Sequence, residues 1–234
     1  MASNAPCVAC GQRVSLSDSS LCSVCETPPL PGMDVSGTVG HEDDWFETPW
    51  PLAQVCVAQA MAVYESQREP ILTVPRVICP AVGRGVFPLA VRWYLDEVMG
   101  VNPNTIVGCD TVDRSPKGLD LFTVVGDART MVPGPGPWDL AIDNIPFDAE
   151  VAIPIVQRFV EIAKYCAFIL PWSPLGGVDQ WAPIMASGAC RPVWAWPIAP
   201  RPWGEHTRET ALYLWRRGEQ PHYTKVDPLP RWRP

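Results

Sequence analysis

The chain has 234 residues, 47% of them hydrophobic, and a formal net charge of −7 at pH 7. This length and composition allow one mid-sized domain with a full core and a small appendage. The acidic balance argues against a general nucleic-acid coat. No apolar run approaches the roughly 20 residues of a membrane span, and the first residues lack the basic and apolar parts of a signal peptide. We therefore expect a cytoplasmic protein with no membrane partner.

The charge is unevenly distributed along the chain. Residues 1–44 carry one Arg and six acidic residues, whereas residues 191–234 carry eight Lys or Arg and four acidic residues. The basic C-terminal part could contact phosphate groups, or it could be an ordinary solvated surface. The sequence leaves these two interpretations open.

Four cysteines near the N-terminus form a C-x₂-C-x₁₁-C-x₂-C pattern, namely Cys7, Cys10, Cys22 and Cys25. Two such pairs a short loop apart put four thiolates within tetrahedral reach of one Zn²⁺. Because the segment is too short and polar to fold unaided, the metal would supply its folding energy. Two disulfides are the alternative, which a reducing compartment disfavours. We predict a structural zinc module over 1–26 and a Pro-rich, acidic linker over 27–44.

From residue 45 onward the sequence alternates predicted helices and strands. Helical spacing covers 53–67, 87–99 and 149–163. Apolar runs predict seven strands, at about 76–79, 105–110, 121–127, 140–144, 167–171, 193–198 and 210–215. This alternation predicts an α/β fold over 45–218, a Rossmann-like, mostly parallel seven-stranded sheet with helices on both faces. Residues 219–234 are predicted to be a basic tail with Pro and Trp, and five scattered cysteines to be core thiols: Cys56, Cys79, Cys109, Cys166 and Cys190.

The first predicted strand leads into a glycine turn, Pro80-Ala81-Val82-Gly83-Arg84-Gly85. Strand, glycine turn and helix make half of a nucleotide-binding unit. Glycines let backbone N–H groups approach a ligand closely, with the helix N-terminus just behind them. Gly-x-Gly turns also occur where a strand simply meets a helix, so this pattern alone leaves both interpretations open.

Three polar residues fall at the carboxyl ends of successive predicted strands, namely Asp110, Asp127 and Asn144. In parallel sheets the ligand site lies at these ends. Each residue alone would be an ordinary helix cap or turn residue. Their shared position beside a glycine turn favours a ligand site.

Several motifs follow one another in a characteristic order and spacing between residues 45 and 218. They are Thr48-Pro49, the turn from Pro80 to Gly85, Asp110, Gly126-Asp127, Asp143-Asn144-Ile145-Pro146-Phe147, and the late stretches Arg201-Pro202-Trp203 and Ala211-Leu212-Tyr213-Leu214-Trp215. In this order they resemble the S-adenosylmethionine-dependent amino methyltransferases that act on adenine N6 in DNA, particularly compact phage-type members. No single motif decides the match.

The resemblance implies a binding site for S-adenosylmethionine made of Thr48, Pro49, Pro80, Ala81, Gly83, Gly85, Asp110 and Asp127. In such enzymes the Gly83–Gly85 turn would cradle the methionine part of the cofactor, and Thr48-Pro49 would close over it. Asp110 would accept both ribose hydroxyls, and Asp127 would accept the adenine amino group.

The resemblance also implies that Asn144, Ile145, Pro146 and Phe147 form the catalytic loop, which in the family reads Asn-Pro-Pro-Phe or Asn-Pro-Pro-Tyr. An exocyclic amine is a poor nucleophile because its lone pair is delocalised into the ring. The Asn144 side chain and the Ile145 carbonyl would accept its two N–H bonds, and Phe147 would stack on a base taken out of the duplex. Transfer would be a direct in-line displacement that relies on positioning and electrostatics.

Two positions depart from the family pattern. Cys79 stands where the family usually has Asp, and a missing carboxylate would weaken the ordering of the glycine turn or the affinity for the cofactor. Ile145 replaces the first proline of the catalytic loop and lacks its fixed φ. These departures keep two alternatives open: a catalytically degenerate binding or assembly module, and an amino methyltransferase acting on RNA or protein. DNA is the expected partner, and the zinc module offers a docking site for a protein partner.

Overall fold

The computed structural model describes residues 47–66, 74–102, 106–112, 123–131, 136–172, 192–198, 209–219, 221 and 224–230. The four-cysteine pattern, the linker predicted over 27–44, Cys190 and the Arg201-Pro202-Trp203 stretch lie outside these ranges. The described elements, in chain order, are α1 (Trp50–Ser66), β1 (Val77–Cys79), α2 (Val86–Trp93), the π-helix η1 (Tyr94–Val98), β2 (Ile106–Asp110), β3 (Thr123–Val125), β4 (Trp138–Asn144), α3 (Ala149–Ile162), β5 (Ala163–Pro171), β6 (Trp194–Ile198), β7 (Thr210–Arg216) and β8 (Lys225–Val226).

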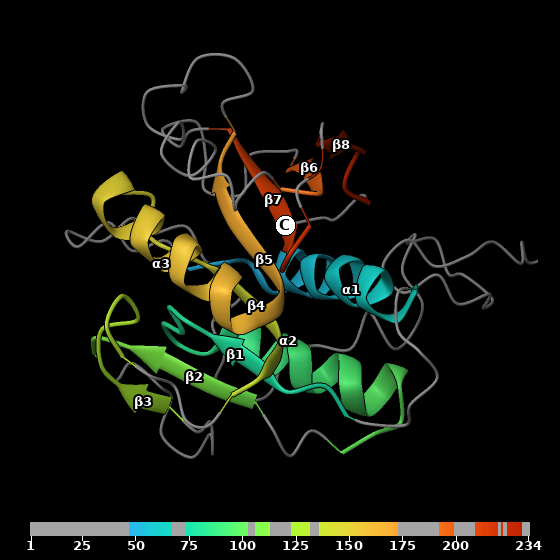
Figure 1. Cartoon of the computed structure of the whole chain (residues 1–234). Helices are drawn as coiled ribbons and strands as arrows, with labels where there is room; N and C mark the ends of the chain where they lie inside the picture. Colours follow the sequence, from blue (N-terminus) through green and yellow to red (C-terminus); the bar gives the residue numbers. More distant parts are fainter. Residues whose placement is uncertain are drawn as a thin grey trace, which may run out of the picture.

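The strands of the described residues form one sheet in the order β3-β2-β1-β4-β5-β7-β6-β8 (Figure 1). Strands β1 to β5 pair in parallel, with Ile78 opposite Val107 on one side and Ala141 on the other. Strand β7 runs antiparallel to both β5 and β6. The parallel pairing brings the carboxyl ends of β1, β2 and β4 together at one edge of the sheet.

Helices cover both faces of the sheet, as the sequence predicts. Helices α1 and α2 pack with inward side chains such as Leu140 and Ile142 on one face, and we call this cluster the α1-side core. Helix α3 packs on the opposite face, where Ile155 and Phe159 meet Phe168, and we call this cluster the α3-side core. Figure 1 shows α3 and the α1–α2 pair on opposite sides of the strands. Buried residues of both β4 and β5 belong to each of the two clusters, as expected for a sheet with helices on both faces.

The predicted helices and strands match the described elements apart from their bounds and the end of the second helix. Residues 94–98 form a π-helical turn in which the N–H of Met99 donates to the Tyr94 carbonyl at 3.1 Å. Gly100, with φ of 64°, then ends the helix, because this left-handed conformation favours glycine. Cys56, Cys79, Cys109 and Cys166 are buried free thiols, as predicted.

The prediction of seven strands is wrong, because the described residues contain eight. Strand β8 lies within the segment predicted to be a basic tail and pairs in parallel with β6. The Lys225 N–H donates to the Val193 carbonyl at 2.9 Å. Strand β8 has two residues, which are too few to show periodicity. A strand this short, which forms by pairing with β6, therefore gives no signal in the sequence.

None of the helices in the described ranges combines the length and the apolar character needed to cross a bilayer.

Phe168 lies at the centre of the α3-side core and tests the packing there. Its ring is fully buried and makes an edge contact with Phe159 and a tilted contact with Trp215, with centroid separations of 6.3 and 6.2 Å. We expect Phe168→Ala to lower the free energy of unfolding by about 3–5 kcal/mol, because it leaves a cavity between these rings. Urea unfolding followed by circular dichroism measures this loss. Val125→Ala, at a side chain that is 60% exposed, is the control and should change stability by less than about 0.5 kcal/mol. A loss below 1 kcal/mol for Phe168→Ala would contradict the packing described here.

Candidate active site

The turn after β1 is built around two glycines with left-handed backbone conformations. Gly83 has φ of 53° and Gly85 has φ of 91°. The N–H of Gly85 donates to the Val82 carbonyl at 2.8 Å, and the N–H of Val82 donates to the Cys109 carbonyl at 3.0 Å. Side chains with a Cβ adopt such φ values at a cost, so glycine is the residue that closes the turn this tightly. The turn ends at the N-terminus of α2, with its backbone ordered by β2.

Asp110, the last residue of β2, fastens the glycine turn through its side chain. Its Oδ2 accepts the N–H of Gly83 at 2.8 Å. Its Oδ1 accepts longer contacts from the Thr111 hydroxyl at 3.4 Å and the Val112 N–H at 3.3 Å. The structure therefore places the carboxylate at the edge of the turn, with the side chain half-buried.

Asp143, near the end of β4, joins the glycine turn to the predicted catalytic loop. Its Oδ2 accepts the N–H of Ala81 at 2.8 Å, and its Oδ1 accepts the N–H of Asn144 at 2.9 Å. The residue is only 2% exposed. Burial raises the pKa of Asp143 well above its usual range, and the nearby Asp110 carboxylate adds to this, while the two N–H donors act in the opposite direction.

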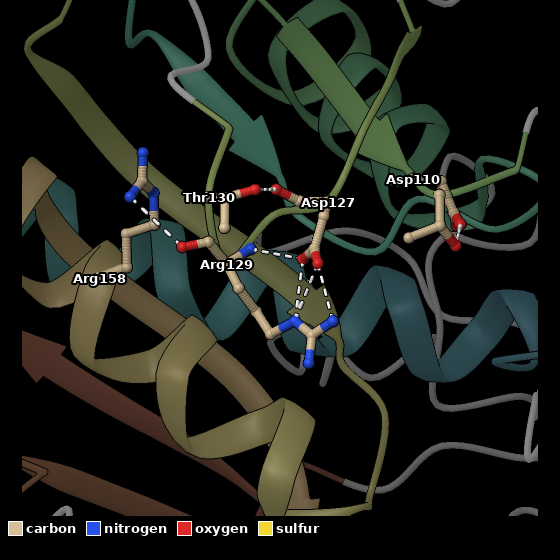
Figure 2. Close-up of polar contacts among 6 residues, drawn as sticks. Asp110, Asp127, Arg129, Thr130 and Arg158 are labelled. Atoms are coloured by element: carbon tan, nitrogen blue, oxygen red, sulfur yellow. Dashed lines mark hydrogen bonds and ion pairs between the residues drawn. The ribbon is translucent and has the colours of Figure 1, made fainter.

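Asp127 lies just beyond β3 and is held by Arg129. The N–H of Arg129 donates to Oδ1 at 2.9 Å, and its guanidinium spans both carboxylate oxygens, with Nε at 3.0 Å from each and Nη2 at 2.7 Å from Oδ2 (Figure 2). These hydrogen bonds hold the pKa of Asp127 below its usual range. The side chains of Arg129 and Asp127 are 42% and 33% exposed, so solvent reaches the pair.

The loop that carries Asp127 and Arg129 is fastened at both ends. The N–H of Gly126 donates to the Asp110 carbonyl at 2.8 Å, which holds Asp127 one strand away from Asp110. On the other side, the guanidinium of Arg158 on α3 donates to the Arg129 carbonyl at 3.4 Å (Figure 2). It also donates to the Met131 carbonyl. Both of these contacts are with backbone carbonyls, so this cation helps to order the loop.

The segment before α1 lies beside the glycine turn. Thr48 is 5% exposed and Pro49 is buried. An ion pair of 3.4 Å joins Glu47 to Arg84, which stands between the two glycines. The ion pair therefore brings Glu47, the residue before Thr48-Pro49, to the glycine turn.

The predicted catalytic loop follows β4 directly and is anchored on both faces of the sheet. Ile145 is 1% exposed and belongs to the α3-side core. Phe147 is half-buried and packs against the α1-side core. Pro146 lies between them, and Asp148 then caps α3 by accepting the Glu150 N–H at 2.9 Å. The side-chain oxygen of Asn144 is shielded from solvent at the start of this loop.

Three features of this edge were not predicted from the sequence. The double acceptor role of Asp143 had one visible signal, an acidic residue directly after the apolar run Leu140-Ala141-Ile142. Asp127 and Arg129 have the i, i+2 spacing at which carboxylates often accept a backbone N–H in turns. The sequence did not indicate that the Arg129 guanidinium would also bind the Asp127 carboxylate. The reach of Arg158 from α3 to the loop spans 27 residues and depends on the sheet order, which the sequence does not state.

Comparison with solved structures shows that this fold is shared with class I S-adenosylmethionine-dependent methyltransferases. A proposed enzyme of that class from Listeria monocytogenes superposes with a TM-score of 0.63 at 12% identity, over 82% of this chain and 68% of the other. A proposed RNA methyltransferase from Pyrococcus horikoshii superposes with a TM-score of 0.54 at 14% identity, over 77% of this chain and 92% of the other. The M protein of the type I restriction enzyme EcoKI gives a TM-score of 0.54 at 12% identity, over 76% of this chain and 45% of the other.

At these identities the likeness is one of fold. No protein-family model matches the sequence, and no curated protein matches it closely.

The Asp127–Arg129 fork gives a prediction on the pKa of a single side chain. Arg129→Gln removes the guanidinium hydrogen bonds to Asp127 and leaves the backbone N–H of residue 129, so the pKa of Asp127 should rise toward the ordinary aspartate value. A carbon-detected NMR titration of the carboxyl groups measures the change. Because the pKa is lowered in the folded state, the pair stabilises the protein above the ordinary aspartate pKa, and this stabilisation is lost as the pH falls through the lowered value.

The matched control is Arg216→Gln, which breaks the distant ion pair with Glu219 and should leave the pKa of Asp127 unchanged. An unchanged pKa in Arg129→Gln would show that the guanidinium does not hold the carboxylate in solution.

Proposed function

We propose that this protein transfers a methyl group from S-adenosylmethionine to the N6 amine of adenine in DNA. The observation that carries the proposal is the position of Asn144, at the carboxyl end of β4 and tied through Asp143 to the glycine turn after β1. An acceptor for a substrate amine and a turn suited to a nucleotide-like cofactor thus stand next to each other. The fold shared with S-adenosylmethionine-dependent methyltransferases supports this interpretation.

The donor and acceptor chemistry of the edge fits the cofactor. The adenosine part of S-adenosylmethionine offers ribose hydroxyls and an amino group as donors, and the ends of β2 and β3 offer the carboxylates of Asp110 and Asp127. In the proposal, Asp110 accepts the ribose hydroxyls while it continues to hold Gly83. Asp127 accepts the adenine amino group through its carboxylate, which remains 33% exposed beside Arg129. Thr48-Pro49, beside Arg84 in the turn, covers the methionine end.

When bound, S-adenosylmethionine supplies a methyl group on a positively charged sulfur. The chain's own residues then have to present the acceptor nitrogen in line with it. The Asn144 side-chain oxygen and the Ile145 carbonyl accept the two N–H bonds of the amine, which withdraws its lone pair from the ring. Phe147 stacks on the base from the α1-side core. Positioning of this kind accounts for the acceleration without a covalent enzyme intermediate.

Among nucleic acids, DNA is proposed first because the motif set resembles adenine methyltransferases acting on DNA. The similarity to the M protein of a type I restriction enzyme agrees with this choice, while the similarity to a proposed RNA methyltransferase keeps RNA as the second candidate. The substitutions Cys79 and Ile145 motivate the competing hypothesis of a binding module without catalysis.

The test is methyl transfer from radiolabelled S-adenosylmethionine to unmethylated duplex DNA, single-stranded DNA and RNA, followed by nucleoside analysis. N6-methyladenosine formed only in RNA would replace the DNA assignment. Calorimetry of S-adenosylmethionine binding identifies the non-catalytic module, for which the titration should give no heat.

Asn144→Ala tests the residue on which the chemistry depends. We expect the rate of transfer to fall by about 10²–10³-fold, because a preorganised group facing the reacting amine is lost. The dissociation constant for S-adenosylmethionine should change less than about threefold, as the proposal gives Asn144 no contact with the cofactor. Rapid-quench single-turnover assays and calorimetry measure these two quantities. Equal activity in the variant would contradict the role given to Asn144.

We also propose that Cys7, Cys10, Cys22 and Cys25 hold one structural Zn²⁺. The support is the sequence spacing alone, because these residues lie outside the described ranges. Elemental analysis of the purified protein should find about one zinc per chain, and Cys10→Ser should lower this content. Protein with no zinc and no free thiols at these positions would favour the two-disulfide alternative.

A further inference from the structure

Asp143 is a buried carboxylate in a strand that otherwise carries apolar residues into the two cores. Strand β4 contributes Leu140 and Ile142 to one core and Ala141 to the other, while Asp143 is 2% exposed. Burial of a charged or polar carboxyl group costs free energy unless its oxygens are hydrogen-bonded. Here each oxygen accepts one backbone N–H, from Ala81 and from Asn144.

These two N–H groups belong to segments separated by more than 60 residues. Ala81 opens the glycine turn after β1, and Asn144 opens the loop after β4. One rigid carboxylate therefore joins the two backbones and limits the distance between them. Main-chain pairing alone does not do this, because the pairing of β1 with β4 ends at Ile78 and Ala141.

Strand β4 carries a second carboxylate at its other end, which also accepts a backbone N–H from a residue next to β1. Asp139 accepts the N–H of Arg76 at 3.0 Å through Oδ2 and the ammonium of Lys164 at 2.7 Å through Oδ1. The two aspartates thus clamp β4 to the residues before and after β1. Asp139 lies at the amino end of the parallel strands, away from the glycine turn, and provides a matched comparison for Asp143.

The end of β1 itself supplies no carboxylate to the turn. Its last residue is Cys79, which is fully buried. Burial and the neighbouring Asp143 raise the pKa of the Cys79 thiol well above its usual range, so this side chain is a neutral thiol. The acceptor for Ala81 comes from the adjacent strand instead.

We propose that Asp143 is a positioning residue for methyl transfer, which sets the distance between the cofactor-holding glycine turn and the Asn144 loop by accepting one backbone N–H from each. The inference rests on the proposed function. It assigns Asp143 no contact with cofactor or substrate. It also explains how the turn stays ordered although Cys79 replaces the usual acidic residue at the end of β1.

The experiment compares Asp143→Asn with Asp139→Asn in the full-length protein. An amide at position 143 can accept one of the two N–H groups and must turn its NH₂ toward the other, which pushes the turn and the loop apart. Misplacement of reacting groups by about 1 Å costs about 10²-fold in rate. We expect Asp143→Asn to lower kcat by about that factor and to weaken S-adenosylmethionine binding several-fold. Asp139→Asn should lower the melting temperature while leaving kcat and the dissociation constant within about threefold of the wild type.

A second variant separates positioning from stability. Adding Cys79→Asp to Asp143→Asn returns a carboxylate two residues before Ala81, the spacing at which Asp148 accepts the Glu150 N–H at 2.9 Å. This carboxylate can hold the turn, but it does not reach Asn144. We therefore expect the double variant to recover affinity for S-adenosylmethionine while kcat stays low. This variant also serves if Asp143→Asn alone does not fold.

The outcomes distinguish this inference from the proposed function. Wild-type protein that neither binds S-adenosylmethionine nor transfers methyl groups would overturn the proposed function. An active wild type with Asp143→Asn matching Asp139→Asn in both kcat and cofactor affinity would overturn the positioning role alone. Recovery of kcat together with affinity in the double variant would likewise reject it, because the link to Asn144 would then be dispensable.

Discussion

The arrangement of the site depends on three parallel strands ending at one edge of the sheet. Strand β1 lies between β2 and β4, and all three run in the same direction. Backbone pairing alone aligns the strands, and side-chain hydrogen bonds then extend this alignment into the loops. Asp110 reaches from β2 to Gly83 and Asp143 reaches from β4 to Ala81. The turn after β1 is therefore held by carboxylates from both neighbouring strands, and its position follows from the sheet.

The three carboxylates at this edge have different environments, which separates their roles. Burial raises the pKa of Asp143, although its two backbone N–H donors act in the opposite direction. Asp127 faces a guanidinium near solvent, so its pKa is lowered. Asp110 stands between them and meets backbone N–H groups and a hydroxyl. An edge of acceptors attracts the hydroxyl and amine donors of a nucleoside and repels phosphate. Under the proposed function, contacts to a nucleic-acid backbone are therefore expected away from the carboxyl ends of β2 and β3.

Much of this fold follows from local sequence patterns, whereas the links between segments do not. The apolar runs around Ile78 and Ala141 and the glycine turn predict strands, helices and the ligand-bearing edge, because periodicity and turn chemistry are local properties. Strand β8 was missed because two residues carry no period. The partner of Asp143 was missed for another reason: a hydrogen bond between residues 62 positions apart depends on strand order, which no local pattern encodes. The sequence shows which polar side chains are available. The strand order of the sheet determines which of them form hydrogen bonds with one another.

Packing and hydrogen bonding hold Ile145, which stands where the family pattern puts a proline in the proposed catalytic loop. Proline would restrict φ at this position, and its loss would leave the loop freer in the unfolded and folded states. The Ile145 side chain is 1% exposed within the α3-side core, while Phe147 packs against the core on the opposite face. Two apolar anchors on opposite faces, with Asp143 accepting the N–H of Asn144 before them, restrict the loop by packing and hydrogen bonding instead of by ring closure. Isoleucine has a backbone N–H that proline lacks, yet it buries a larger branched side chain, which offsets the lost rigidity. The loop can therefore be ordered without the proline of the family pattern. Its order comes from the packing of Ile145 and Phe147 against the two cores instead of from a proline ring.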